Sequence, residues 1–392
     1  MKSAVEDFKV VITRKERFTF ITKAVVFLVI FAIGVIAGLW TATGPRRCCS
    51  TYTNILFPST TVYRYRDGDV GGGGGSSFAE FVAPTRLMHD MTDEQLFWRA
   101  TMSPASSDVA SYPFRRVPKV AFMFLAGHGV LPLAPLWERF FRGHEEHFSV
   151  YVHAPPGMVV NVSRDSPFYG RQIPSQEASW GSITLMDAEK RLLANALLDF
   201  SNERFVLLSE SCIPLRPFPA AYAYLTGSRH SFVESYYHGD KSCRGRYSRR
   251  MAPVVTLPQW RKGSQWFELA RGLAVAVLAD TTYYPLFREH CRPSCYPDEH
   301  YLPTVVALVR HGGGGRNANR TVTYVDWSRG GAHPVTFAAG DVTPELIMGI
   351  RRSEVPCMYN SRPTTACFLF ARKFAPDALV PLLNISSAVM GY

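Results

Sequence analysis

The sequence predicts a three-layer α/β domain with a mostly parallel central sheet from about residue 116 onward. Three short and nearly continuous apolar runs, at residues 117–126, 147–157 and 203–210, have the pattern of strands that are buried on both faces. Helical patterns separate these runs, and such alternation is typical of a parallel sheet covered by helices on both sides. The composition, with 47% hydrophobic and 19% charged residues, also fits a folded chain.

The helices between and after these strands are expected in three segments. Residues 133–143 form the first, and residues 182–200 form the second, with Ser182 as its N-cap. Apolar residues recur along one side of the second segment at the spacing of an amphipathic helix. Residues 264–280 are expected to form the third helix, beginning at Ser264.

The last part of the chain continues the alternation. Residues 298–310 predict a helix, which Pro303 would kink or delay because proline removes a backbone donor. Residues 320–327 and 365–374 are expected to be strands. At 392 residues, the chain is long enough for one large or two medium domains.

Ligands of open α/β sheets gather beyond the carboxyl ends of the strands. In this chain the three predicted strands end at residues 127–129, 153–157 and 209–215, which all have the glycine, proline and polar residues of loops. We expect a binding site where these loops meet.

The N-terminus has the pattern of a signal-anchor. Residues 24–40 are uncharged and span roughly 26 Å as a helix, close to the thickness of a thin bilayer. Six Lys or Arg residues precede this segment, which predicts a cytosolic N-terminus. A cleaved signal peptide is the alternative, although its charged region would be unusually long. We expect a cytosolic tail at 1–23, a transmembrane anchor at 24–43, a stem at 44–115 and a lumenal domain at 116–392.

The stem has low sequence complexity. It contains a glycine-rich run at residues 71–77, which is typical of a flexible tether, and a short predicted helix at 91–100 with Thr92 as its cap. It also contains an Asp-x-Asp sequence at residues 67–69. Since this sequence lies outside the α/β pattern, we interpret it as an exposed turn and not as a metal site.

The net charge of +11 is spread along the chain and not gathered on one helix or segment of the predicted domain. Nucleic-acid binders concentrate such an excess, so no nucleic-acid partner is expected. An enzyme that handles anionic substrates, such as nucleotide sugars, suits this distribution. No G-x-S-x-G or H-E-x-x-H sequence is present, so a hydrolase has little direct support.

All eight cysteines follow the predicted anchor, which favours an oxidising compartment. Six of them belong to the predicted domain, and the sequence leaves their pairing open. A zinc cluster of His290, Cys291, Cys295 and His300 is the alternative to disulfides. Three glycosylation sequons, at Asn161, Asn319 and Asn384, agree with a lumenal domain.

Two adjacent carboxylates, Asp298 and Glu299, begin the predicted helix at 298–310. One interpretation is structural: Asp298 caps the helix and Glu299 interacts favourably with its dipole. The other is catalytic: a carboxylate at this place takes the proton of a substrate hydroxyl. The two interpretations are compatible, because a capping Asp298 would fix the direction of Glu299.

Residues 117–383 resemble the core-2/I-branching β-1,6-N-acetylglucosaminyltransferase family, and particularly its plant branch. The likeness rests on the order and spacing of several segments, among them FMFLAGHG, FSVYVHAPPG, FVLLSESCIPL, GRYSRRMAPVV, RKGSQWFELAR, YPDEHYLPT, TYVDWSRGGAHP and CFLFARKF. The resemblance implies a type II membrane protein of the Golgi with a GT-A-like fold. It further implies an inverting sugar transferase that works without a metal ion or other cofactor.

The resemblance also implies roles for individual residues. Glu299 matches the catalytic base of the family, and Lys373, with Arg372 beside it, matches the cation that offsets the charge of the departing UDP. His333 lies near a second basic diphosphate contact, where the chain departs from the family pattern. The residues matched to uridine binding are Val152, His153 and Val325. The residues matched to acceptor binding are Arg246, Tyr247, Trp266 and Trp327.

The resemblance therefore implies transfer of a sugar, first of all N-acetylglucosamine, from a UDP-sugar to a hydroxyl of a glycan or glycoprotein. UDP-xylose or UDP-glucuronic acid are alternative donors. A non-catalytic, membrane-anchored carbohydrate-binding protein is the alternative from another class, and it would need neither Glu299 nor Lys373. Cys212 replaces an Asp common in animal relatives, so the acceptor stays open.

Overall fold

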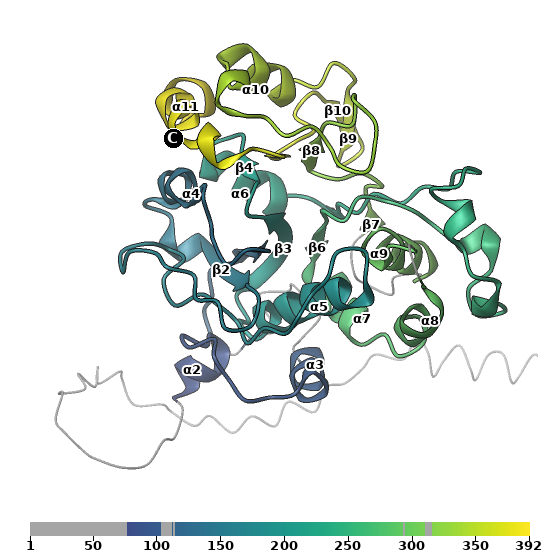
Figure 1. The fold of residues 1–392 in the computed structure, drawn as a ribbon. Coiled ribbons are helices and arrows are strands. Elements are labelled where there is room, and N and C mark those ends of the chain that lie inside the picture. The colour runs from purple at the N-terminus through teal and green to yellow at the C-terminus, as the bar shows by residue number, and fades with distance from the viewer. Residues whose placement is uncertain (1–76, 103–111, 113, 293–294, 310–315) are drawn as a thin grey trace, which may run out of the picture. The chain divides into compact units, whose positions relative to one another are not determined.

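The computed structural model describes residues 77–102, 112, 114–292, 295–309 and 316–392, which belong to one unit of residues 73–392 (Figure 1). The predicted cytosolic tail at 1–23, anchor at 24–43 and Asp-x-Asp at 67–69 lie outside these residues. Among the helices that are described, none is both long enough and apolar enough to cross a membrane.

The central sheet has the strand order β2-β1-β3-β6. Strands β1 (Lys119–Leu125), β2 (Phe148–His153) and β3 (Asn202–Ser209) run parallel, and β6 (Glu268–Ala270) is antiparallel to β3. The three predicted strands are thereby confirmed. Residues of β2 and β3 are buried along their whole length, which explains why their sequences are continuously apolar and do not alternate.

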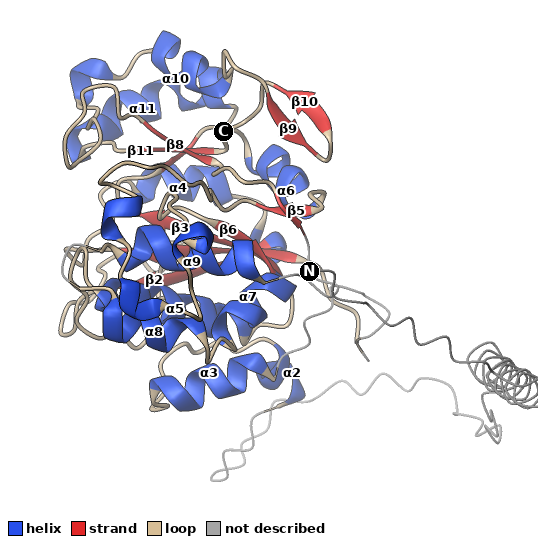
Figure 2. Cartoon of the chain, turned by 90° about the vertical axis from the view of Figure 1, so that its right-hand side faces the viewer, coloured by secondary structure: helices blue, strands red, loops and turns tan. Residues whose placement is uncertain are grey.

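Helices cover both faces of this sheet (Figures 1 and 2). Side chains on one face of β1, such as Ala121 and Met123, share a core with one group of helices, and those on the other face, such as Phe122 and Phe124, share a core with a second group. The first group is α3 (Asp93–Thr101), α5 (Ile183–Leu197), α7 (Arg271–Leu278), α8 (Tyr283–His290) and α9 (Pro297–Leu308); the second is α4 (Ala134–Phe141), α6 (Phe218–Thr226), α10 (Pro344–Arg351) and α11 (Leu379–Ile385). The predicted three-layer α/β arrangement is confirmed.

Three smaller groups of strands extend the molecule. β11 (Phe370–Arg372) runs parallel to β8 (Thr323–Val325) and antiparallel to β4 (Ile213–Pro214). β5 (His230–Ser231) pairs with β7 (Arg316–Asn317), and β9 (Cys357–Tyr359) pairs with β10 (Arg362–Thr364). The predicted strands at 320–327 and 365–374 thus exist, although each is shorter than its apolar run.

The helix predicted at 264–280 is partly wrong. Its middle forms β6, and only α7 is helical, with Ala270 and not Ser264 at the N-cap. The physical reason is pairing with β3: Glu268 is fully buried and forms two hydrogen bonds, of 2.6 and 2.7 Å, with Arg204. The apolar residues of this segment fit either a helix or a strand, so pairing with β3 determines its secondary structure.

The start of α9 also differs from the prediction. The N-cap is Tyr296, in a left-handed conformation with φ of 54°, and Pro297 is the first helical residue. Asp298 is therefore not the cap, and its side chain is buried. Pro303 lies inside the helix and does not delay its start. Glu299 does lie in the first turn.

Part of the segment assigned to the stem is packed against the domain. The capping box between Thr92 and Gln95 starts α3, as predicted for Thr92. Leu96 and Ala100 of this helix are buried in the same core as α5. With α2 (Phe78–Val82), which precedes it, α3 belongs to the folded unit and not to a free tether.

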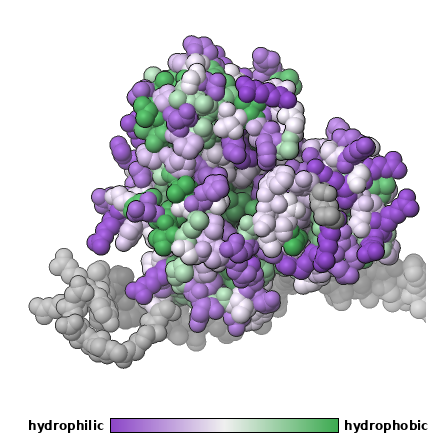
Figure 3. All heavy atoms as spheres, viewed as in Figure 1, coloured by the Kyte–Doolittle hydropathy of each residue, from purple (hydrophilic) through white to green (hydrophobic). Residues whose placement is uncertain are grey.

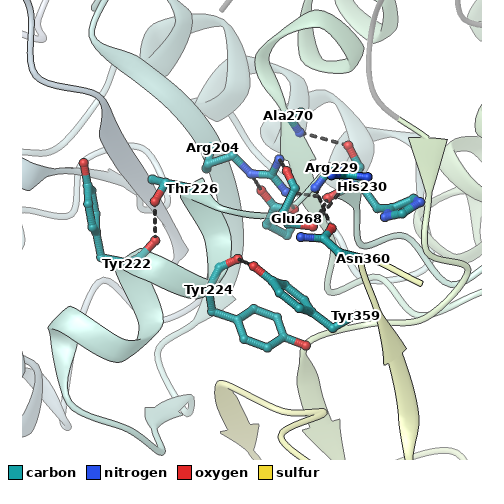
Figure 4. A network of polar contacts seen from close by, with 12 residues as sticks. Arg204, Tyr222, Tyr224, Thr226, Arg229, His230, Glu268, Ala270, Tyr359 and Asn360 are labelled. Carbon is teal, nitrogen blue, oxygen red and sulfur yellow. Dashed lines mark hydrogen bonds and ion pairs between the residues drawn. The ribbon is translucent and has the colours of Figure 1, made fainter. Parts of the chain in front are cut away.

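A buried polar network joins β3, β6 and the segment after α6 (Figure 4). Arg204 binds Glu268 and also donates to the carbonyl oxygen of His230 at 2.6 Å. At the same place the hydroxyl of Tyr359 donates to the carbonyl oxygen of Tyr224 at 2.9 Å, which holds the β9–β10 hairpin against α6.

The described part of the chain contains two disulfides, Cys291–Cys295 and Cys357–Cys367, whereas Cys212 and Cys243 are buried free thiols. The first disulfide uses both cysteines of the alternative zinc cluster. Among the described residues, no group of three His, Cys, Asp or Glu side chains is placed to hold a metal ion.

Candidate active site

The carboxyl ends of the central strands and of β11 meet at one edge of the molecule. The amide of Ala126, after β1, donates to the carbonyl oxygen of His153 at the end of β2, at 2.9 Å. The amide of Glu210, after β3, donates to Leu125 at 3.2 Å. The amide of Phe374, after β11, donates to Ser211 at 3.0 Å. These bonds bring the loops after the strands together, as the sequence predicted.

The residues matched to uridine binding lie at this edge. Val152 is fully buried at the end of β2, and Val325 pairs with Arg372 in the β8–β11 ladder. His153 is also buried, and its Nε2 has no hydrogen-bond partner. Burial, together with nearby Arg191, lowers the pKa of His153 to about 4, so its imidazole is neutral at neutral pH.

Two basic residues follow one another at the end of β11. The Arg372 guanidinium lies 4.2 Å from the ring centre of Trp266, which is itself buried, so the tryptophan supports a cation. The Nε of Arg372 is buried without a partner. Lys373 is half-buried and its carbonyl oxygen accepts from Phe337 at 2.8 Å, but its ammonium has no ion pair with any described residue. Both side chains retain capacity to bind an anion.

Glu299 is held between two cations. Its Oε2 lies 2.7 Å from Nη1 of Arg246 and 3.2 Å from Nζ of Lys262, and its side chain is 26% exposed. Its carbonyl oxygen accepts a bond of 2.9 Å from the amide of Gly263. The carboxylate is thus fixed in direction and remains open to solvent on one side, as a general base requires.

Gly263 makes this arrangement possible. A Cβ at this position would lie 1.8 Å from the carbonyl oxygen of Glu234 and 3.0 Å from Pro303. Only glycine allows such a close approach of two backbones. The segment 261–263 is therefore clamped between Glu234 and α9, which places Lys262 beside Glu299.

Asp298 lies in different surroundings from its neighbour. Its side chain is buried, its Oδ1 has no hydrogen-bond partner, and burial together with the charge of Glu299 raises its pKa to about 7. Glu189 of α5 is also buried, accepts a bond of 2.8 Å from Gln265, and has its pKa raised by burial and by Asp298. A buried pair of acids therefore lies behind the exposed carboxylate.

Glu299 and Lys373 belong to one connected part of the structure. Glu299 is bonded to Gly263, and three residues farther along the chain Trp266 supports Arg372, which immediately precedes Lys373. An aromatic group links the start of α9 to the loop after β8. Its members are His333, Trp180 and Tyr296, with ring centres 5.4 Å apart for His333 and Trp180 and 5.1 Å apart for Trp180 and Tyr296.

The other residues matched to acceptor binding differ in exposure. Tyr247 donates its hydroxyl proton to the carbonyl oxygen of Val255 at 2.7 Å and packs on Trp260, so it has a structural contact of its own. Trp327 is 51% exposed in the loop after β8. Of the sequon residues, Asn161, Asn319 and Asn384 are all exposed, although Oδ1 of Asn319 accepts a bond from Ser235.

The sequence profile described as the core-2/I-branching enzyme matches residues 120–351, which is more than half of the chain. The chain belongs to the core-2/I-branching enzyme family. A rice relative, Glycosyltransferase BC10 from Oryza sativa subsp. japonica, is 38% identical over 313 residues, which cover 68% of this chain and 76% of the relative. This core-2/I-branching enzyme is therefore a glycosyltransferase, and its parallel-rich α/β sheet fits the GT-A-like fold that the resemblance implied.

Several residues at the candidate site of this glycosyltransferase were assigned no role from the sequence. Trp180, Lys262 and Tyr296 contact the group around Glu299 only because distant segments fold together. The presence of Tyr296 immediately before the matched PDE motif could have drawn attention to it. Lys262 lies within the segment RKGSQWFELAR, but nothing in that segment indicates that its ammonium reaches Glu299.

Proposed function

We propose that this glycosyltransferase moves a sugar, N-acetylglucosamine in the first instance, from a UDP-sugar to a hydroxyl of a glycan or glycoprotein, with inversion and without a metal ion. The observation that carries the proposal is Glu299, fixed by Arg246 and Lys262 yet partly exposed, and connected through Trp266 to the cations Arg372 and Lys373. UDP-xylose and UDP-glucuronic acid remain alternative donors.

In the proposed reaction, Glu299 takes the proton of the acceptor hydroxyl as its oxygen bonds to the anomeric carbon of the donor. The bond between this carbon and the β-phosphate oxygen breaks on the opposite face, and its electron pair leaves with UDP. Arg372 and Lys373 stabilise the negative charge that develops on the leaving diphosphate. His333 is a further candidate for this contact. The neutral His153 and the strand ends at Val152 and Val325 take the uridine.

A Golgi lumen is the proposed location, with residues 24–43 as a type II anchor. Two observations support it. The two disulfides require an oxidising compartment, and the three sequon asparagines are exposed. A lumenal domain of this kind would meet both UDP-sugars and glycoproteins.

The substitution Glu299→Gln tests the base. It keeps the size of the side chain but removes its ability to accept a proton, so we expect transfer to fall at least about 100-fold while UDP binding stays unchanged. Transfer is measured with a panel of radiolabelled UDP-sugars and binding by calorimetry. Glu94→Gln, an exposed acid on α3, is the matched control. Normal transfer by Glu299→Gln would show that another group is the base.

A further inference from the structure

Trp180 is an exposed tryptophan that is nevertheless held in place. Its side chain is 60% exposed, and it lies in the loop that precedes α5. The ring of Tyr296 meets it nearly edge-on, with 5.1 Å between ring centres, and His333 lies 5.4 Å away on another loop. An indole that is both open to solvent and supported by two rings has the properties of a binding surface.

The residue next to Trp180 permits this packing. Gly181 has φ of +72°, and a Cβ there would lie 3.1 Å from the ring of Tyr296. Any other residue would be strained in this conformation and would crowd the tyrosine. Tyr296 itself has φ of 54°, which L-residues adopt at a cost. The loop of Trp180 and the start of α9 are thus fitted to each other.

The contacts continue from Trp180 to the proposed base. The guanidinium of Arg246 lies 4.1 Å from the ring centre of Tyr296, and the same guanidinium binds Glu299 at 2.7 Å. Trp180, Tyr296, Arg246 and Glu299 therefore form a continuous row, called here the aromatic row. Its inner end is the carboxylate and its outer end is the exposed indole.

We propose that Trp180 binds a pyranose ring of the acceptor, with Tyr296 holding the indole in position. This inference rests on the proposed function, because it takes Glu299 as the group that receives the acceptor proton. The C–H face of a pyranose is apolar and packs on an aromatic ring, whereas its hydroxyls stay in water. An acceptor whose hydroxyl reaches Glu299 would extend outward along the aromatic row.

The observations favour the acceptor over the donor sugar as the occupant. The donor is expected at the strand ends, where Arg372 lies on the buried ring of Trp266. Unlike Trp266, Trp180 is exposed to solvent. An exposed ring suits the acceptor, because a glycan attached to a large molecule needs an open surface. The role of Trp180 follows from contacts between separate loops.

The test compares Trp180→Ala and Trp180→Phe with the full-length wild-type protein. Trp98→Ala is the matched control, because Trp98 is 67% exposed on α3. Saturation-transfer NMR is recorded in the presence of UDP with the methyl β-glycosides of galactose, N-acetylgalactosamine, glucose and xylose. Transfer kinetics and the hydrolysis of UDP-N-acetylglucosamine without acceptor are measured on the same preparations, and thermal unfolding verifies that each variant is folded.

We expect Trp180→Ala to lose the saturation transfer seen with the wild type and to raise the acceptor KM about 10-fold, the effect of losing one aromatic contact. Trp180→Phe should retain most of the affinity, and neither Trp98→Ala nor donor hydrolysis should change. A wild-type acceptor KM in Trp180→Ala would overturn the proposal. So would saturation transfer from none of the four glycosides, or a parallel loss of donor hydrolysis, which would assign Trp180 to the donor.

Failure of the proposed function has a different signature. In that case the wild-type protein neither transfers nor hydrolyses a UDP-sugar. The saturation-transfer comparison between wild type and Trp180→Ala still decides whether the indole binds a sugar.

Discussion

Asp298 and Glu299 are adjacent in sequence, but the fold gives them opposite surroundings. Glu299 has 26% of its side chain exposed and two cations beside it. Asp298 is 5% exposed, lies near the buried Glu189, and has no hydrogen-bond partner for Oδ1. A base that must meet a substrate hydroxyl needs an accessible carboxylate whose charge is balanced by nearby cations. Of these two residues, only Glu299 has both properties.

The raised pKa of Asp298 makes stability depend on pH. Its folded pKa is about 7, above the unfolded value, so the group costs no stability at low pH and destabilises the fold as the pH rises toward 7. We therefore compare the free energy of unfolding of Asp298→Asn with that of the wild type. We expect this difference to shift in favour of the variant by about 2–3 kcal/mol between pH 5 and pH 8.

Unfolding in urea at the two pH values measures this difference. Part of the effect belongs to the pair with Glu189, since interacting acids titrate together. The control is Asp90→Asn, which changes an exposed acid on another part of the molecule. A pH-independent difference for Asp298→Asn would mean that Asp298 is charged in the folded protein.

At this scale the sequence was informative only where a motif exists. The PDE motif pointed to Glu299, but it also suggested Asp298 as a helix cap, which is wrong because Tyr296 takes that position. The burial of Asp298 depends on α5, more than 100 residues earlier in the chain. Likewise Trp180 has no periodicity that separates it from any exposed loop residue.

Residues 262–266, which lie between β5 and β6, contact both Glu299 and Arg372. Gly263 binds the backbone of Glu299, Lys262 binds its side chain, and Trp266 supports Arg372. A single short segment therefore positions both the proposed base, Glu299, and Arg372, one of the proposed cations. Its position depends on the close approach of Gly263 to Glu234.

The substitution Gly263→Ala tests this segment. The added methyl group would lie 1.8 Å from a backbone oxygen, so the segment must move, and we expect a loss of about 2–3 kcal/mol in stability together with reduced transfer. Calorimetric unfolding and transfer assays measure the two effects. Gly340→Ala, where the methyl group meets no atom within 4 Å, is the control. Equal behaviour of the two variants would show that the segment does not fix the site.

The strands that are most deeply buried were the easiest to predict from the sequence. Strands β1, β2 and β3 are buried on both faces, so their continuous apolar runs marked them correctly. β6 was not predicted, because a strand of three residues is too short to show the alternation of a strand. The apolar residues of α7, which follows directly, made the whole segment resemble a helix. Pairing of a short strand is a tertiary event that local sequence does not encode.

On the scale of the whole molecule, the loops after parallel strands form one functional edge. Bonds between these loops join β1, β2, β3 and β11, and the buried network of Arg204 and Glu268 fixes the other side of the sheet (Figure 4). The surface in Figure 3 is largely hydrophilic, with hydrophobic residues in separate patches. The meeting of the loops at the strand ends could be predicted from topology, whereas the contacts of Lys262 with Glu299 and of Trp180 with Tyr296 could not.

The proposed function requires that protein cations take the place of a metal ion at the leaving diphosphate. The most direct measurement is UDP binding by calorimetry in the presence of EDTA, for wild type, Lys373→Ala and the control Lys119→Ala. Lys119 lies at the opposite end of β1, where it pairs with Asp199. We expect UDP to bind without divalent ions, Lys119→Ala to bind it normally, and Lys373→Ala to lose about 1.5–3 kcal/mol of the binding free energy. Binding that requires Mn²⁺, or that is unchanged in Lys373→Ala, would contradict it.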